Sequence, residues 1–232
     1  MDKKEIQSFS LSRLLEDHEL RPGDLYYDGC LIASRVDSQC DIHTDLFSYP
    51  MRMDAIALVF CSKGSITLTR QVLGEHALYI NLPGSIFQVE SMERAELHAA
   101  ICEKEFIQRI NVDLKLLSRL FLRLERQPLL QLDDEQWQEI MRSFDEISHE
   151  RDLYRDDAYS IEILRSAIRM LIYKVSRIID RYSECPHTEQ DVHSPRNRQE
   201  EYFQRFMNVL TQHYTEERSV GFYASQLNLT PK

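Results

Sequence analysis

Residues 55–70 read AIALVFCSKGSITLTR, and this segment indicates the fold class. Its first half is an unbroken apolar run, whereas in its second half Ile66 and Leu68 alternate with Thr67 and Thr69. An alternation of period two is typical of a strand with one buried face. The pair Lys63-Gly64 between the halves supplies the dihedral angles of a tight turn, so we expect two strands joined there.

The same pattern extends to both sides of this segment. Short apolar or alternating runs cover residues 25–36, 76–82, 85–91 and 95–102. Turn-forming pairs punctuate the region as well, namely Asp28-Gly29, Gly74-Glu75 and Pro83-Gly84. Short strands at regular spacing with such turns predict an antiparallel barrel or sandwich.

After Cys102 the apolar period becomes helical. Apolar residues recur every three or four positions from Phe106 to Leu124, and Pro128 closes that segment. A second helix is expected to begin with the acidic residues 133–135, to carry its apolar face from Trp137 to Ile147, and to end before the charged stretch 150–157. Strands followed by helices predict an α+β chain.

The third predicted helix has the most regular spacing in the chain. Its apolar residues repeat every seven positions in two registers, and they form a seam of about three heptads: Ile161, Leu164, Ile168, Leu171, Val175, Ile178 and Tyr182. Ala167, Ile172 and Ile179 widen this stripe. Two interpretations stay open: a core helix within one chain, or a helix that also buries a face against a partner.

Residues 219–232, SVGFYASQLNLTPK, predict one helix, a turn and the first residues of another helix. Ser219 suits an N-cap, Asn228 suits a turn that ends the helix, and Thr230-Pro231 is the pairing expected where the next helix begins. The residues that define the motif are Val220, Tyr223, Ala224, Leu227, Leu229, Thr230, Pro231 and Lys232. We interpret the segment as a helix-turn-helix cut within its second helix, with an ordinary two-helix corner as the alternative.

This terminal run resembles a known family. Together with Phe206 and His213-Tyr214, it looks like the opening of the DNA-binding domain of AraC/XylS-type bacterial transcription regulators. Residues 54–64 and 79–84 are similar to the cupin-type barrel at the N-terminus of many such regulators. The resemblance implies promoter DNA as a partner of the full-length protein, a small-molecule effector in the barrel, and a homodimer formed through the helices that follow it.

The resulting domain prediction has three parts. Residues 1–183 form a cupin-like effector and dimerisation domain, with the barrel at about 20–103 and helices at about 104–183. Residues 184–198, polar and containing Pro186 and Pro195, form a linker. Residues 199–232 are the truncated start of the DNA-binding domain.

The charge distribution separates these parts. The net charge of -10 has the wrong sign for gripping phosphates, yet the balance is near neutral from Arg196 onward. The acidic upstream part therefore fits sensing and association. The N-terminus is charged and lacks an apolar signal core, and no stretch approaches about twenty apolar residues, so we expect a cytoplasmic protein without a membrane partner.

The cysteines and histidines argue against a metal centre. Five scattered cysteines without a Cys-x-x-Cys pair are interpreted as reduced thiols, with a redox sensor as the alternative. Metal-binding cupins typically carry a His-x-His pair, whereas His43, His76 and His98 are isolated here. We expect no metal, no cofactor and no enzymatic activity.

Five side chains are candidates for a ligand pocket in the strand region. They are polar or aromatic groups able to orient a small polar ligand: His43, Tyr49, Arg52, Tyr79 and His98. The guanidinium of Arg52 can hold a carboxylate or phosphate in a bidentate manner. Each can instead be a surface or core residue. Two other functions stay open, a metabolite-binding or catalytic cupin enzyme and a dimerisation module without a ligand.

Overall fold

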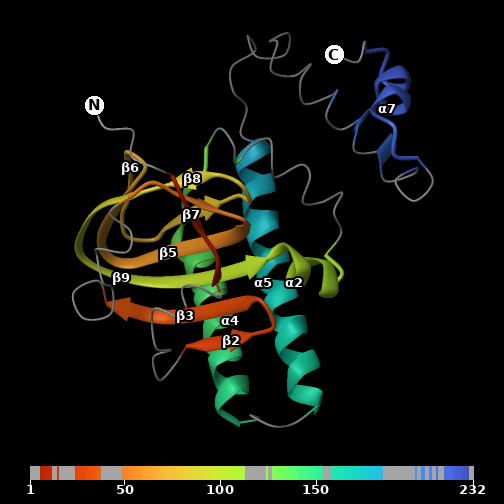
Figure 1. The fold of residues 1–232 in the computed structure, drawn as a ribbon. Helices are drawn as coiled ribbons and strands as arrows, with labels where there is room; N and C mark the ends of the chain where they lie inside the picture. Colours follow the sequence, from red (N-terminus) through yellow and green to blue (C-terminus); the bar gives the residue numbers. More distant parts are fainter. Residues whose placement is uncertain are drawn as a thin grey trace. The chain divides into compact units, whose positions relative to one another are not determined.

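The computed structural model describes residues 6–11, 15, 24–37, 49–112, 124, 127–153, 158–184, 202, 205–206, 209–210, 213 and 217–229. It divides into two compact units, residues 1–112 with 124–175 and residues 113–123 with 176–232. All described strands belong to the first unit, and the C-terminal helix belongs to the second (Figure 1). The predicted domain boundaries at 183 and 199 stay predictions.

The first unit is built on a seven-stranded antiparallel sheet in the order β10-β7-β5-β9-β3-β2, with β6 paired to β5 (Figure 1). Its strands are β2 (Leu25–Tyr27), β3 (Cys30–Asp37), β5 (Ala55–Leu68), β6 (Gln71–Leu73), β7 (Ala77–Asn81), β9 (Val89–Glu103) and β10 (Leu129–Gln131). A second sheet has the order β1-β4-β8 and contains β1 (Gln7–Phe9), β4 (Met51–Met53) and β8 (Ile86–Phe87). The α+β class with a strand-rich front is confirmed.

The predicted closed barrel is replaced by two packed sheets. Among the described strands, the large sheet keeps open edges at β2, β10 and β6, and each of these strands is only three residues long. The second sheet covers one face of the large sheet through an apolar cluster of Met51, Met53, Ala55, Ala57 and Phe87. This cluster buries the face of the large sheet that meets the second sheet, which we call the inner face. Within the described strands, the edges of the large sheet are not hydrogen-bonded to each other.

Three predicted turns are present, but Lys63-Gly64 is not a turn. Asp28 and Gly29 both have positive φ, 51° and 85°, as a two-residue hairpin of type I′ requires. The chain instead continues through Gly64 as one strand, β5, whose pairing with β9 shifts on both sides of Lys63. Gly64 is needed there because a Cβ would lie 2.3 Å from the carbonyl oxygen of Glu93.

The described helices are α2 (Lys104–Arg109), α4 (Asp134–Leu153), α5 (Ala158–Glu184) and α7 (Val220–Gln226). Two predicted helices differ from expectation. The helix expected over residues 106–124 is interrupted after Arg109, where Asn111 adopts a positive φ of 51°. Leu124 is again helical, residues 113–123 lie outside the described chain, and the end expected before Pro128 stays a prediction. Helix α4 continues into the charged stretch as far as Leu153, since its charged residues can face solvent.

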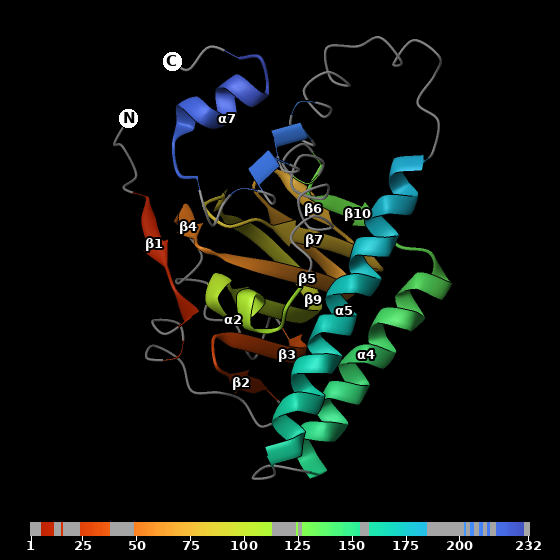
Figure 2. The ribbon, with the colours of Figure 1, turned by 90° about the vertical axis from the view of Figure 1, so that its right-hand side faces the viewer.

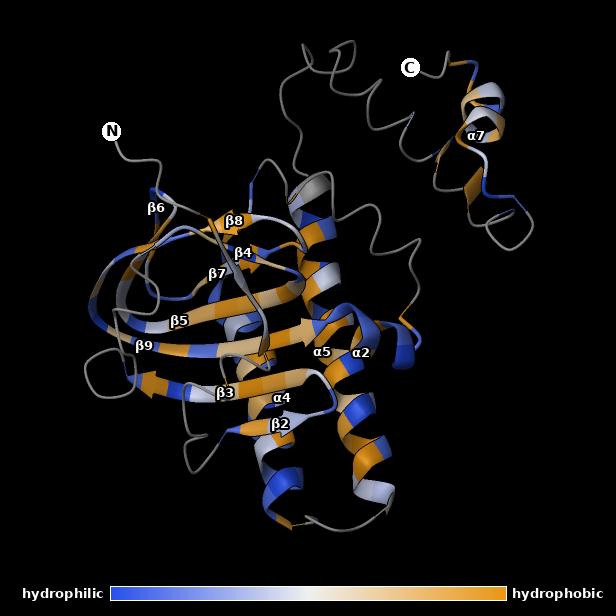
Figure 3. Ribbon diagram, in the orientation of Figure 1, coloured by the Kyte–Doolittle hydropathy of each residue, from blue (hydrophilic) through white to orange (hydrophobic). Residues whose placement is uncertain are grey.

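Helix α4 begins with a capping box. The backbone N–H of Gln136 donates to the Asp133 carboxylate over 2.8 Å, and the Gln136 side-chain oxygen accepts from the Asp133 N–H over 3.1 Å. Helices α4 and α5 run alongside each other and along the large sheet (Figure 2). Apolar colouring is concentrated in the parts of β3, β5 and β9 that lie near α5, whereas the first half of β9 is largely hydrophilic and exposed (Figure 3).

Candidate functional site

The predicted pocket residues that the structure describes do not converge on one site. Tyr79 pairs with Val59 and His98 pairs with Phe60, and Val59 and Phe60 are consecutive residues of β5. Because consecutive side chains of a strand point to opposite faces, Tyr79 and His98 lie on opposite faces of the sheet. Their predicted role in a shared pocket finds no geometric support.

Neither Tyr49 nor Arg52 belongs to the apolar cluster that contains Tyr79. Arg52 is exposed on β4, between the buried residues Met51 and Met53, so its guanidinium points away from the core that its neighbours join. The side chain of Tyr49 is 49% exposed. His43 lies outside the described residues. Of the four described candidates, only Tyr79 lies in the inner apolar cluster, which consists of Cys61, Ile66, Leu68, Leu73, Ala77, Tyr79, Ala95 and Leu97.

The inner face carries a buried amide that sequence analysis missed. Asn81 is 3% exposed and lies opposite Ala57 in the β7–β5 pairing, on the same face as Tyr79. Its amide nitrogen donates to the carbonyl of Leu82 over 3.1 Å, whereas its side-chain oxygen has no hydrogen-bond partner within the described chain. Burial raises the pKa of Tyr79, so its phenol is neutral at physiological pH. The face thus offers one buried acceptor at Asn81, two residues along β7 from Tyr79, whose neutral hydroxyl is hydrogen-bonded to Thr69.

The helix-facing side of the sheet places His98 among aromatic rings. The His98 imidazole lies 5.4 Å from the Phe144 ring and 6.4 Å from the Trp137 ring, measured between centroids. Trp137 also stacks on His76 at 4.7 Å with an interplanar angle of 17°. Burial lowers the pKa of His98, so the ring is neutral at pH 7. His98 therefore forms part of the sheet–α4 interface.

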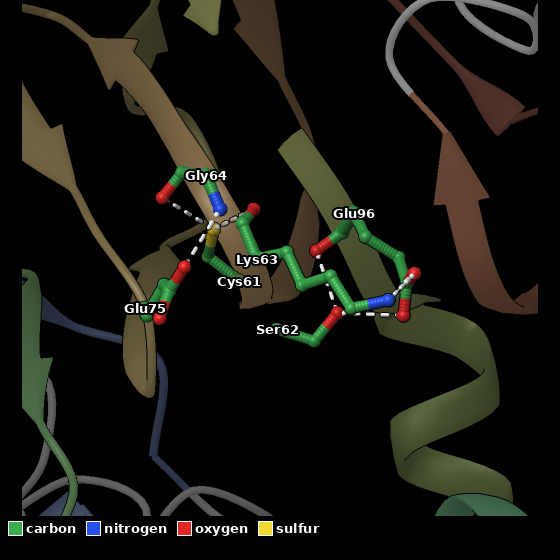
Figure 4. Close-up of polar contacts among 6 residues, drawn as sticks. All are labelled: Cys61, Ser62, Lys63, Gly64, Glu75 and Glu96. Atoms are coloured by element: carbon green, nitrogen blue, oxygen red, sulfur yellow. Dashed lines mark hydrogen bonds and ion pairs between the residues drawn. The ribbon is translucent and has the colours of Figure 1, made fainter. Parts of the chain in front are cut away.

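The irregular part of β5 carries the polar cluster drawn in Figure 4. The Cys61 thiol donates to the carbonyl of Lys63 over 3.1 Å, and the N–H of Gly64 donates to the Glu75 carboxylate over 3.3 Å. Across the strand pair, Lys63 Nζ lies 2.9 Å from Glu96 Oε2. The hydrogen bond from this ammonium is the main reason that the pKa of Glu96 is lowered. These contacts hold the bend together.

The same cluster is poorly suited to nucleophilic chemistry. Burial raises the pKa of Cys61 to about 11, although the hydrogen bond to Lys63 opposes the shift. A thiol is reactive as its thiolate, so Cys61 is a weak nucleophile at neutral pH. We interpret the cluster as the hydrogen-bonded corner of the sheet.

The heptad seam of α5 is buried within the chain. Ile161 and Tyr182 are partly buried, and the remaining seam residues are buried: Leu164, Ile168, Leu171, Val175 and Ile178. Buried side chains cannot also meet a second copy, so the seam follows the core-helix interpretation rather than the predicted dimer interface. The exposed apolar residues of α5 are others, namely Tyr159, Ile163 and Met170.

A charged network missed by the sequence analysis links the β2–β3 hairpin to two helices. The Asp28 carboxylate lies 3.0 Å from Arg109 of α2 and 3.5 Å from Arg165 of α5. Arg165 also pairs with Glu162 at 2.6 Å and lies over the ring of Tyr27 at 5.6 Å. The sequence did contain a signal for this network, because the turn Asp28-Gly29 was predicted and Asp28 places an acidic side chain at its tip.

The C-terminal unit contains a well-formed helix end. Asn228 has a positive φ of 55°, its N–H donates to the carbonyl of Ser225, and the N–H of Leu229 donates to the carbonyl of Ala224 over 2.8 Å. These two bonds define a Schellman motif. Tyr223 and Leu227 are buried, and the Tyr223 hydroxyl donates to the carbonyl of Glu217 over 2.7 Å. The predicted helix and its terminating turn are therefore present.

The motif residue Leu229 is 47% exposed, and its backbone N–H completes the turn. Within residues 217–229, the side chain of Ser219 makes no capping hydrogen bond. Thr230, Pro231 and Lys232 lie outside the described residues.

The described residues contain no group of three or more His, Cys, Asp or Glu side chains placed to hold a metal ion. None of the helices among them combines the length and the apolar character that a membrane span needs.

Comparisons with known proteins gave matches among solved structures. No protein-family model and no curated protein matches the sequence. The AraC-like transcriptional activator CuxR is similar in structure, with 13% identity, a TM-score of 0.46, and coverage of 89% of this chain and 69% of CuxR. An apo form of a ToxT variant from Vibrio cholerae has 12% identity, a TM-score of 0.39, and coverage of 88% and 72%. Wild-type ToxT with a bound unsaturated fatty acid has 10% identity, a TM-score of 0.31, and coverage of 89% and 67%.

Proposed function

We propose that this chain is the sensing and pairing part of an AraC-type transcription regulator, together with the beginning of its DNA-binding domain. The observation that carries the proposal is the end of α7, where Asn228 and Leu229 form the Schellman turn predicted for the corner of a helix-turn-helix. The sequence resemblance names the family on these same residues. A recognition helix would have to follow this corner to reach the bases.

The charge of the chain supports a division of labour. With a net charge of -10, the chain lacks the cationic excess that phosphate binding requires. DNA affinity would reside in residues that follow the corner, whereas the two-sheet unit would sense an effector or hold a partner. Promoter occupancy would then depend on the state of that unit, a coupling between separate sites.

The experiment that tests the regulator function is cross-linking and immunoprecipitation of the natural gene product in its own cells, followed by sequencing of the recovered DNA. We expect enrichment of discrete promoter fragments. As a matched control, a variant with Tyr223→Ala, which removes the buried ring beneath the corner, should lose the enrichment. Recovery of DNA no different from that of an untagged strain would refute the proposal.

For the effector we propose contact with the inner face at Asn81 and Tyr79. The side-chain oxygen of Asn81 is a buried acceptor that a hydroxyl donor can satisfy, and its surroundings include the apolar residues Ala57 and Tyr79. The implied effector is a small, largely apolar molecule with one donor. Phenol and medium-chain alcohols are suitable probes in a thermal-shift assay, and Asn81→Leu should abolish the response that the parent chain shows.

For pairing we propose that a second copy meets the exposed stripe of α5, Tyr159, Ile163 and Met170, with Tyr159 77% exposed. A dimer that forms through this stripe, and not through the buried seam, leaves the core of each copy intact. Analytical ultracentrifugation at micromolar concentration should show a dimer for the parent chain and a monomer for Ile163→Asp. Val72→Asp, at an exposed apolar position on β6, is the control that should remain dimeric. A monomeric parent chain would contradict this interface.

A further inference from the structure

Two cysteines face each other across the neighbouring strands β3 and β9, next to the edge strand β2 of the large sheet. Cys30 is the first residue of β3, directly after the Asp28-Gly29 turn, and Cys102 is the next-to-last residue of β9. They are register partners, their Sγ atoms are 3.2 Å apart, and their exposed fractions are 1% and 4%. Both are free thiols.

The backbone at this pair is already suited to a disulfide. The N–H of Glu103 donates to the carbonyl of Gly29 over 2.8 Å, so Gly29 and Glu103 form a hydrogen-bonded pair. In an antiparallel ladder the next pair is then non-hydrogen-bonded, with Cα atoms about 4.5 Å apart. That separation lies within the range of about 4.4–6.8 Å seen across disulfides. Closing the bond requires side-chain rotation rather than a change of register.

We propose that Cys30 and Cys102 form an oxidisable dithiol, which a peroxide converts into an intrachain disulfide between β3 and β9. One thiol is first oxidised by hydrogen peroxide to a sulfenic acid, and the peroxide leaves as water. The second thiol attacks that sulfur, the S–S bond forms, and the hydroxyl leaves as a second water. Two thiols and one peroxide thus give one disulfide and two waters.

The position of Cys30 and Cys102 in the sheet determines how peroxide reaches them. Strand β2 is a three-residue edge strand, so opening of the β2–β3 hairpin exposes Cys30 without unfolding the centre of the sheet. Burial raises the pKa of Cys30, and its contact with the neighbouring thiol of Cys102 acts in the same direction. Little of Cys30 is therefore thiolate at neutral pH, so oxidation requires an excess of peroxide.

The disulfide would act on the charged network at the same hairpin. Asp28, two residues before Cys30, bonds to Arg109 of α2 and to Arg165 of α5. Helix α2 begins two residues after Cys102. Locking β3 to β9 restricts the hairpin that carries Asp28, and this restriction reaches the helix whose exposed face we propose for pairing.

The experiment uses the full chain with Cys40→Ser and Cys185→Ser, which leaves Cys30, Cys61 and Cys102 as the three thiols. After treatment with hydrogen peroxide, intact mass spectrometry should show a loss of two hydrogens, and thiol labelling after unfolding should find Cys61 alone. Peptide mapping should find Cys30 linked to Cys102. Dithiothreitol should restore the original mass and all three labels.

Two variants separate the proposed pair from other oxidation. Cys30→Ser should lose the two-hydrogen change, whereas Cys61→Ser, the matched control, should keep it. Three labelled thiols after peroxide, a mass gain of oxygen atoms in place of the loss, or the same loss in Cys30→Ser would overturn the proposal. The chain that keeps Cys30 and Cys102 needs no substitution at the pair. Its mass change and peptide map therefore test the disulfide even where Cys30→Ser does not fold.

Discussion

The two halves of the β5–β9 ladder are built on opposite principles. From Ala55 to Cys61 the register with β9 is unbroken, and apolar residues occupy both faces. From Ser62 to Leu68 the register shifts three times, Gly64 adopts a positive φ, and polar side chains bridge the strands. The regular half, residues 55–61, packs against helix α4, whereas the irregular half, residues 62–68, bends.

This difference shows how one strand serves two roles. The regular half presents Phe60 to the helix side, where it meets Phe144 edge to face at 5.5 Å. The irregular half turns so that Ile66 and Leu68 join Tyr79 in the inner cluster. Bulges increase the local bend of a strand, so the shifts allow the sheet to cover its own inner face.

The largest expected effect lies in the regular half. Phe60→Ala removes a fully buried ring and leaves a cavity against Phe144, so the free energy of unfolding should fall by about 4 kcal/mol. Urea unfolding followed by circular dichroism measures this loss. Val72→Ala, at an exposed position, should change stability by less than about 0.5 kcal/mol. A similar cost for both variants would mean that the regular half is not the structural core.

The next effect tests the bend. At Gly64 a Cβ would lie 2.3 Å and 2.4 Å from the carbonyl oxygens of Glu93 and Arg94, so Gly64→Ala should cost about 3 kcal/mol in urea unfolding. Gly84 also has a positive φ, 79°, but nothing lies within 4 Å of its Cβ position. Gly84→Ala should therefore cost only about 1 kcal/mol. Equal costs would show that β9 does not approach Gly64 this closely.

A pH titration probes the interface between the regular half and α4. Because burial lowers the pKa of His98, the unfolded state binds a proton more readily than the folded state. The stability that comes from the neutral His98 is fully present above the ordinary pKa of 6.5. The free energy of unfolding should decline as the pH falls through that value toward the lower pKa of the folded state.

The single tryptophan, Trp137, lies beside His98 and reports unfolding by its fluorescence. Urea unfolding at several pH values measures the decline for the parent chain and for His98→Gln, in which it should be reduced. An unchanged pH dependence in His98→Gln would assign the effect to other groups.

The smallest expected effect concerns the ion pair at the bend. Lys63 and Glu96 lie 2.9 Å apart, but the lysine side chain is 71% exposed, so Lys63→Gln should cost about 0.5 kcal/mol. High salt should remove most of the difference between the variant and the parent chain. A loss above about 1.5 kcal/mol would mean that the pair, rather than the backbone at Gly64, holds the bend.

Local sequence patterns predicted the elements better than their junctions. The period-two run at Ile66 and Leu68 is a half-buried strand segment, and the Asp28-Gly29 turn has the expected dihedral angles. The Lys63-Gly64 turn was wrong because a glycine required for close backbone approach has the same sequence signature as a glycine required for a turn. Strand β10 was not predicted, since three residues carry too little periodicity.

The candidate site was harder to predict than the fold. Tyr79 and His98 are 19 residues apart on different strands, and which face each side chain meets depends on the pairing register with β5. The contact between Cys30 and Cys102 depends on the same kind of long-range register. Asn81 gained its importance from a neighbourhood assembled by other strands.

Taken by itself, the sequence determined the strand-rich front, the long helix of residues 158–184 and the turn at Asn228, because each follows from periodicity or from the conformational preference of a few adjacent residues. Tertiary structure alone decided that the heptad seam is buried, that the large sheet has open edges, and that two cysteines touch across the strands. The physical reason is that burial and contact depend on which distant segments pack together, and no local pattern records that choice.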